Sequence, residues 1–185
     1  QGPSVDAFEK TFAERVGTRH AVAFANGTAA LHGAYFAAGV GPGVEVITSP
    51  MTFAATSNAA LYLGGTVRFA DMDPATLCLD PKKAGERITP RTKVIAPVSF
   101  AGYPADLAAF REAAEGSGAV IVEDACHALG ASADDRDADA EDRAVGASVE
   151  ARVGARTGDC RDSAMTVFSF HPVKTVTMGE GGAVT

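Results

Sequence analysis

Several features of secreted, membrane and nucleic-acid-binding proteins are scarce in this sequence. Its 185 residues include three cysteines and no tryptophan, and 16 basic residues are outnumbered by 23 acidic ones, for a net charge of −7. An odd, scattered set of cysteines argues against a disulfide framework and for a reducing compartment such as the cytoplasm. The acidic balance argues against a nucleic-acid partner. No apolar run reaches the roughly 18 residues that a membrane helix requires, so we expect no membrane partner.

The motifs that mark common nucleotide and metal sites are missing as well. No G-x-G-x-x-G run follows a strand-like segment and no Walker-type lysine is present, which disfavours a generic α/β nucleotide-binding protein. The triplet Asp135, Asp137 and Asp139 has the spacing of a calcium loop. However, Ala140 and Gly146 stand where such a loop requires glycine and glutamate. The sequence therefore predicts no metal site.

The sequence does contain a regular alternation of short β-rich apolar runs and segments with helical spacing. With 46% hydrophobic residues, the chain has enough apolar material for a packed core. The alternation predicts βαβ units, and hence an α/β fold with a mostly parallel sheet covered by helices on both faces. The expected strands cover residues 20–24, 45–48, 66–70, 93–98, 119–123 and 165–168, and the expected helices cover residues 6–16, 28–38, 53–63, 81–87 and 105–115.

Residues 132–162 depart from this alternation. They hold nine acidic and five basic residues, which accounts for four of the seven net negative charges. With few large apolar side chains to bury, this stretch is expected to be a solvated, partly disordered insertion or loop. The chain begins with Gln1 and ends at Thr185 inside an apolar run, so we expect it to be a piece of a longer protein.

A turn that can hold an anion follows the first expected strand. In open α/β sheets, ligands bind outside the carboxyl ends of the strands, so the residues just after each strand are informative. Gly27 permits a tight turn, and Thr28 can cap a helix whose first N–H groups suit a phosphate. A plain capped helix explains the same residues, and this turn taken alone favours that interpretation.

Two further strand ends carry ionisable groups. Asp124 follows the fifth expected strand, with His127 three residues later. Ser169 follows the sixth, and Lys174 comes five residues after it. Taken singly, the aspartate could cap a helix and the lysine could be an ordinary exposed one. A lysine beside apolar and glycine-rich sequence can also have a lowered pKa and act as an amine nucleophile.

Together, a phosphate-binding turn, a carboxylate and a lysine are the parts that pyridoxal phosphate requires. Its phosphate needs neutral donors, its ring nitrogen needs an acid, and its aldehyde needs a lysine amine. Phe53 offers an aromatic ring to stack on the cofactor, although it could equally be a core residue.

Four segments resemble the sugar aminotransferases of the DegT/DnrJ/EryC1/StrS family, and the resemblance runs from about residue 6 to residue 185. The family has the aspartate-aminotransferase-like fold, so the resemblance implies that residues 1–185 form an incomplete large domain that binds pyridoxal phosphate. The lysine segment, followed by Glu-Gly-Gly, is most similar to the branch that makes UDP-4-amino-4,6-dideoxy-N-acetyl-altrosamine for pseudaminic acid. The segments are NGTAAL (26–31), GPGVEVIT (41–48), EDACHALG (123–130) and SFHPVK (169–174).

The resemblance implies three catalytic residues. Lys174 would form the Schiff base with the cofactor and then, once freed, move the proton as general base. Asp124 would pair with the pyridine nitrogen. His127 would stand near the phenolic oxygen of the cofactor.

It also implies a set of cofactor-binding residues. Thr28, the backbone N–H of Ala29 and Ser169 would hold the phosphate, and Phe53 would stack on the ring. His171 receives no role.

The resemblance further implies a reaction and partners. Glutamate would donate an amino group that passes to a nucleotide-linked 4-keto-6-deoxy sugar. Family members continue into a small C-terminal domain and work as homodimers with shared active sites, so this piece is expected to lack part of its substrate pocket. Two alternatives stay open: a non-catalytic or truncated relative that serves as a binding module, and a dehydratase. Lys174 argues against the dehydratase, in which histidine replaces this lysine.

Overall fold

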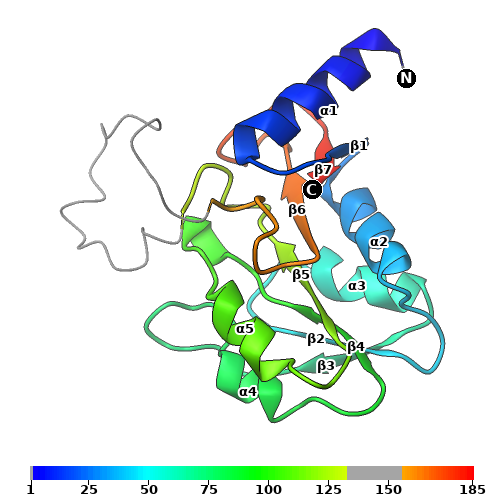
Figure 1. Cartoon of the computed structure of the whole chain (residues 1–185), viewed down its shortest axis with the longest axis vertical. Coiled ribbons are helices and arrows are strands. Elements are labelled where there is room, and N and C mark those ends of the chain that lie inside the picture. Colours follow the sequence, from blue (N-terminus) through cyan, green and yellow to red (C-terminus); the bar gives the residue numbers. More distant parts are fainter. Residues whose placement is uncertain (1, 133–155) are drawn as a thin grey trace.

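The computed structural model describes residues 2–132 and 156–185, which form a sheet with helices on both faces (Figure 1). Seven strands within these residues lie in the order β1-β7-β6-β5-β4-β2-β3. The strands are β1 (Val22–Phe24), β2 (Glu45–Thr48), β3 (Thr66–Phe69), β4 (Thr92–Ala96), β5 (Val120–Asp124), β6 (Met165–Ser169) and β7 (Gly182–Val184). The helices are α1 (Pro3–Val16), α2 (Gly27–Ala37), α3 (Ala55–Tyr62), α4 (Pro81–Gly85) and α5 (Leu107–Ala113), with a 3₁₀ turn, η1 (Phe100–Gly102).

The strand directions confirm the predicted α/β fold with a mostly parallel sheet. Strands β6, β5, β4, β2 and β3 pair in parallel, whereas β7 runs antiparallel to both β1 and β6. The sequence analysis does not predict β7, a three-residue strand that pairs with segments distant in the sequence. Gly182 allows β7 to lie against the turn after β1, since a Cβ at this position would overlap the carbonyl of Asn26.

Strand β5 shows how alternation sorts side chains between the two faces of the sheet. Val122 belongs to the hydrophobic core shared with α2 and α3. Its neighbour Ile121 belongs to the core on the other face, with α4 and α5. Because successive side chains point to opposite faces, Asp124 lies on the α2/α3 side and Glu123 on the opposite side. The last two residues of this strand therefore have different surroundings.

The observed helices agree with the predicted ones except at their ends. Helix α2 begins at Gly27, and its N-cap is Asn26, whose Oδ1 accepts a hydrogen bond from the N–H of Ala29 at 2.9 Å. The expectation that Thr28 caps this helix is therefore wrong. The side chain of Asn26, two residues earlier, accepts from an N–H group at the start of the helix that has no partner within it. Helix α3 begins at Ala55 rather than at residue 53, which leaves Phe53 in the preceding loop.

Helix α1 carries a stripe of aromatic and aliphatic residues. Phe12 and Val16 are buried, and Phe8 stacks on Phe12 with ring centroids 5.5 Å apart. Phe12 also meets Phe168 of β6 edge to face at 5.2 Å. Aromatic pairs of this geometry stabilise the fold beyond the burial of their surface. They hold α1 against strand β6.

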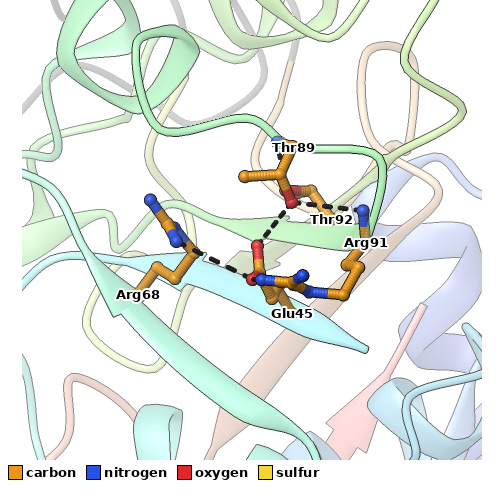
Figure 2. A network of polar contacts seen from close by, with 5 residues as sticks. All are labelled: Glu45, Arg68, Thr89, Arg91 and Thr92. Carbon is orange, nitrogen blue, oxygen red and sulfur yellow. Dashed lines mark hydrogen bonds and ion pairs between the residues drawn. The ribbon is translucent and has the colours of Figure 1, made fainter. Parts of the chain in front are cut away.

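At the amino end of the sheet, a buried glutamate is neutralised by arginines (Figure 2). Glu45, the first residue of β2, is only 3% exposed. Its carboxylate accepts hydrogen bonds from the Arg91 guanidinium and from Oγ1 of Thr89, and Nη1 of Arg68 lies 3.7 Å from Oε1. The Thr89 hydrogen bond and the two arginines hold the pKa of Glu45 below its ordinary value. This network ties β2 to β3 and to the loop before β4.

The predictions drawn from composition concern membrane helices, metal ligands, cysteines and the acidic stretch. Within residues 2–132 and 156–185, no helix is long and apolar enough to cross a membrane, and no cluster of His, Cys, Asp or Glu could hold a metal. Cys78, Cys126 and Cys160 are free thiols. Most of the acidic stretch, residues 133–155, lies outside the described residues. At its described edges, Ser132 and Arg156 form an isolated antiparallel bridge.

Candidate active site

A cavity of about 330 Å³ lies where the carboxyl ends of β5 and β6 meet the beginning of α2. Its position is the one expected for ligands of a parallel α/β sheet. The cavity brings together residues that lie far apart in the sequence. The predicted site residues that line it are Thr28, Phe53, Asp124, His127, Ser169 and Lys174.

The predicted phosphate end is formed by close packing of α2 against β6. A Cβ on Gly27 would lie 2.8 Å from Cβ of Ser169 and 3.2 Å from Sγ of Cys126, so glycine is required for this approach. Thr28 and Ser169 both face the cavity. Ala29 is not among the lining residues, and its N–H already donates to the side chain of Asn26. The phosphate role of the Ala29 N–H stays a prediction.

Asp124 is buried, with 4% of its surface exposed, and its carboxylate is held at both oxygens. Oδ2 accepts a hydrogen bond from Oγ1 of Thr56 at 2.6 Å, and Oδ1 accepts one from the backbone N–H of Cys126 at 3.2 Å. Burial raises the pKa of the Cys126 thiol well above its ordinary value, and the neighbouring Asp124 raises it further. The cavity therefore contains a carboxylate of fixed orientation beside a neutral thiol.

Lys174 is presented by a tight turn after β6. The N–H of Lys174 donates to the carbonyl of His171 at 2.9 Å, which closes the turn through Pro172. The side chain is partly exposed and lines the cavity. Its charge is close enough to oppose the rise in the pKa of Cys126 and to add to the lowering, by burial, of the pKa of His127. The amine and the Asp124 carboxylate thus belong to one site.

His127 is partly buried at the same cavity. Its Nδ1 accepts a hydrogen bond from the N–H of Ala101 at 3.3 Å, and its ring packs edge to face on Phe100 at 5.9 Å. Burial lowers the pKa of this imidazole, and the Lys174 cation lowers it further. Because Nδ1 is an acceptor, a neutral ring carries its proton on Nε2, which leaves one donor for a ligand.

Phe53 lies at the wall of the cavity and not in the core. Its side chain is 72% exposed, which rules out the alternative that it is a simple core residue. The neighbouring Thr52 also lines the cavity. An exposed aromatic ring beside a cavity can stack on a planar ligand.

Sequence reasoning missed several residues of the site. Thr56 is fully buried and meets Asp124 across 68 positions of the sequence, so no local pattern could reveal the contact. The sequence could have revealed the role of Asn26. Asparagine is among the most favoured N-cap residues, and Asn26 directly precedes the first residue of α2. His171 lines the cavity, and its Nδ1 accepts a weak hydrogen bond from the N–H of Val173 at 3.4 Å.

A second cavity, of about 440 Å³, lies beside α1. It is lined largely by apolar side chains, with two arginines, and none of the predicted site residues faces it. Its lining includes Phe8, Phe12, Arg15, Arg156, Phe170 and Met178. The predicted chemistry is therefore concentrated in the first cavity.

Comparison with known proteins gives relatives in sugar metabolism. The chain is 42% identical over 185 residues to the spore coat polysaccharide biosynthesis protein SpsC of Bacillus subtilis. It is 39% identical over 184 residues to GDP-perosamine synthase of Caulobacter vibrioides. Both matches cover the whole of this chain, which spans 42% and 44% of the two relatives.

Solved structures agree with the sequence matches. The crystal structure of DesI in the presence of its TDP-sugar product has a TM-score of 0.82 and 38% identity, and the match covers all of this chain and 41% of that one. NtdA from Bacillus subtilis with bound cofactor PMP has a TM-score of 0.83 and 32% identity, with all of this chain and 37% of that one covered. These structures confirm the predicted fold.

The family-level match extends from residue 1 to residue 185. It confirms the resemblance drawn from the four sequence segments, whereas the altrosamine branch stays a prediction. The chain belongs to the DegT/DnrJ/EryC1/StrS aminotransferase family.

Proposed function

We propose that the protein is a pyridoxal-phosphate-dependent aminotransferase that acts on a nucleotide-linked keto sugar. The observation that carries this proposal is the meeting of Lys174, Asp124 and the turn at Thr28 around one cavity. Its relatives include a GDP-perosamine synthase and a protein of spore coat polysaccharide biosynthesis, and a structural neighbour contains a TDP-sugar product. A nucleotide sugar is therefore the best-supported class of substrate.

The residues of the cavity fit pyridoxal phosphate. An amine, a carboxylate held at both oxygens, an exposed aromatic ring and a helix N-terminus are the groups that this cofactor needs. When bound, pyridoxal phosphate supplies an aldehyde that carries the amino group and a ring that withdraws electrons.

Each residue of the chain then has a distinct task. Lys174 would hold the cofactor through its amine and, once freed, would serve as general base. Asp124 would pair with the ring nitrogen and keep it protonated. His127 has Nε2 free to donate and would stand near the phenolic oxygen, and Phe53 would stack on the ring.

The phosphate end uses neutral donors. Thr28 and Ser169 offer hydroxyl groups, and the first N–H groups of α2 add a favourable dipole for an anion. The predicted contribution of Ala29 requires its N–H to be shared with Asn26.

Glutamate as the amino donor, a 4-keto-6-deoxy sugar as acceptor and the altrosamine branch belong to the same proposal. So does a homodimer with shared active sites. Phe53 and Val173 line the cavity with 72% and 77% of their surfaces exposed, which suits cover by a second copy of the chain.

The proposal is tested by trapping the cofactor. The chain is incubated with pyridoxal phosphate, reduced with borohydride, digested and mapped by mass spectrometry. We expect the pyridoxyl mass on Lys174, its loss in Lys174→Ala, and its retention in the control Lys93→Ala, which removes an exposed lysine of β4. Labelling of other lysines with none on Lys174 would overturn the proposal. Labelling of Lys174 without transamination of a nucleotide-linked keto sugar by the full-length protein would favour the binding-module alternative.

A further inference from the structure

A chain of two hydroxyl groups leads from the wall of the active-site cavity to Asp124. Oγ1 of Thr52 lies 2.7 Å from Oγ1 of Thr56, which in turn lies 2.6 Å from Oδ2 of Asp124. Thr52 lines the cavity, whereas Thr56 is fully buried in the first turn of α3. The three side chains thus connect the loop before α3 with the end of β5.

The direction of these hydrogen bonds follows from the number of protons. A carboxylate can only accept, so Thr56 donates its single hydroxyl proton to Asp124. Thr56 therefore has no proton left for Thr52, and Thr52 must be the donor between them. The carbonyl of Phe53, 3.2 Å from Oγ1 of Thr56, is a more distant alternative acceptor. Hydroxyl groups linked in this order polarise one another and strengthen the final bond.

Thr56 is itself held from a second helix. The hydroxyl of Tyr35 in α2 donates to the backbone carbonyl of Thr56 at 3.0 Å, and Tyr35 is completely buried. Burial raises the pKa of this phenol well above its ordinary value, so it remains a neutral donor. With its backbone anchored and its side chain enclosed, Thr56 offers Asp124 a donor at a fixed point.

We propose that Thr56 is a positioning residue for Asp124, and that Thr52 supports it by donating to its hydroxyl. Together with the N–H of Cys126 at the other oxygen, Thr56 fixes the plane of the carboxylate and its aim into the cavity. The task assigned to Asp124, the hydrogen bond to the ring nitrogen, rests on the function proposed above. The orientation itself is a property of the chain alone.

Three variants separate the hydroxyl of Thr56 from its shape. Thr56→Val removes the donor with little change in volume, and Thr56→Ser restores it. Thr48→Val is the matched control, because Thr48 is equally buried and its Oγ1 donates to the carbonyl of Ala96 at 2.8 Å, away from Asp124. We expect Thr56→Val to bind pyridoxal phosphate roughly tenfold more weakly, because the freed Asp124 side chain must be ordered when the cofactor binds. Thr56→Ser should rescue most of this loss, and Thr48→Val should show none of it.

Crystal structures of the same variants test the orientation without any cofactor. The Asp124 carboxylate should rotate or become mobile in Thr56→Val and stay in place in Thr56→Ser. Unchanged geometry and unchanged affinity in Thr56→Val would overturn the proposal. If the unmodified chain fails to label at Lys174, the proposed function fails, but the crystal structures still decide whether Thr56 orients Asp124.

A double-mutant cycle shows whether Thr56 acts through Asp124. If it does, Thr56→Val should add nothing to the loss of cofactor affinity already caused by Asp124→Asn. If the two losses simply multiply, Thr56 acts by another route and its assignment as a positioning residue is wrong.

Discussion

At the amino end of the sheet, Glu45 is neutralised by arginines (Figure 2), whereas at the carboxyl end Asp124 is held by uncharged donors. Among the described residues, no arginine or lysine forms an ion pair with Asp124. Both carboxylates are buried, so burial alone does not distinguish them. The difference is that the charge of Glu45 is neutralised within the fold, whereas that of Asp124 faces a cavity. A buried carboxylate without a cation of its own is the better candidate for a ligand.

The largest effect should come from neutralising the carboxylate at the carboxyl end. Asp124→Asn should lower the rate of amino transfer by on the order of 100-fold, because the ring nitrogen loses its charged partner. Its thermal midpoint should change less than that of Glu45→Gln. The rate is measured on the full-length protein with glutamate and a nucleotide-linked keto sugar. A rate within twofold of that of the unmodified protein would remove the proposed role of Asp124.

Two glycines at opposite ends of the sheet offer a second comparison. Gly27→Ala should weaken binding of pyridoxal phosphate by roughly tenfold, because the new Cβ displaces the turn from Ser169. Gly41→Ala, in the loop before β2, is the control, since a Cβ there meets no atom within 4 Å. Both affinities follow from fluorescence titration. Equal affinities in the two variants would show that the packing at Gly27 does not shape the phosphate end.

The arginine network at the amino end should contribute to stability rather than to chemistry. Glu45→Gln should lower the free energy of unfolding by about 1–2 kcal/mol, since charge-assisted hydrogen bonds become neutral ones. Because the pKa of Glu45 is lowered in the folded protein, its contribution is present above pH 4.5 and is lost as the pH falls below that value. Urea denaturation at neutral and acidic pH measures both effects. A loss of cofactor binding without a loss of stability would contradict this separation.

The smallest effect concerns Glu123, which lies beside Asp124 but faces the other side of the sheet. Its carboxyl accepts hydrogen bonds from Ser99 and Thr166, and burial raises its pKa from 4.5 to about 7. Between these values the folded chain keeps a proton that the unfolded chain has lost, so stability should fall as the pH rises through this range. The change of stability with pH therefore has the opposite sign to that caused by Glu45.

The variant Glu123→Gln should flatten this part of the profile. Urea denaturation at several pH values between about 4.5 and 7 measures the slope for both proteins. A profile for Glu123→Gln as steep as that of the unmodified protein would show that another group is responsible.

Much of this arrangement could be predicted from local patterns in the sequence. The alternation of strands and helices gives the fold, and the rule that ligands bind at carboxyl strand ends brings Thr28, Asp124 and Lys174 together. Strand β7 could not be predicted in this way, because it is short and pairs through contacts distant in sequence.

The supporting contacts of the site were hidden for the same physical reason. Thr56 and Tyr35 lie on helices whose patterns indicate burial but not hydrogen-bond partners. The family resemblance supplied the roles of His127 and Ala29, which residue types alone did not. The sequence therefore predicted the groups that line the cavity better than those that hold them in place.

The most direct test of the central claim is a crystal structure of the chain with pyridoxal phosphate. We predict electron density continuous from Lys174 to the cofactor, with the ring nitrogen in hydrogen-bond contact with Asp124 and the phosphate beside Thr28 and Ser169. Cofactor bound in the cavity beside α1, or with its ring nitrogen turned away from Asp124, would contradict the account.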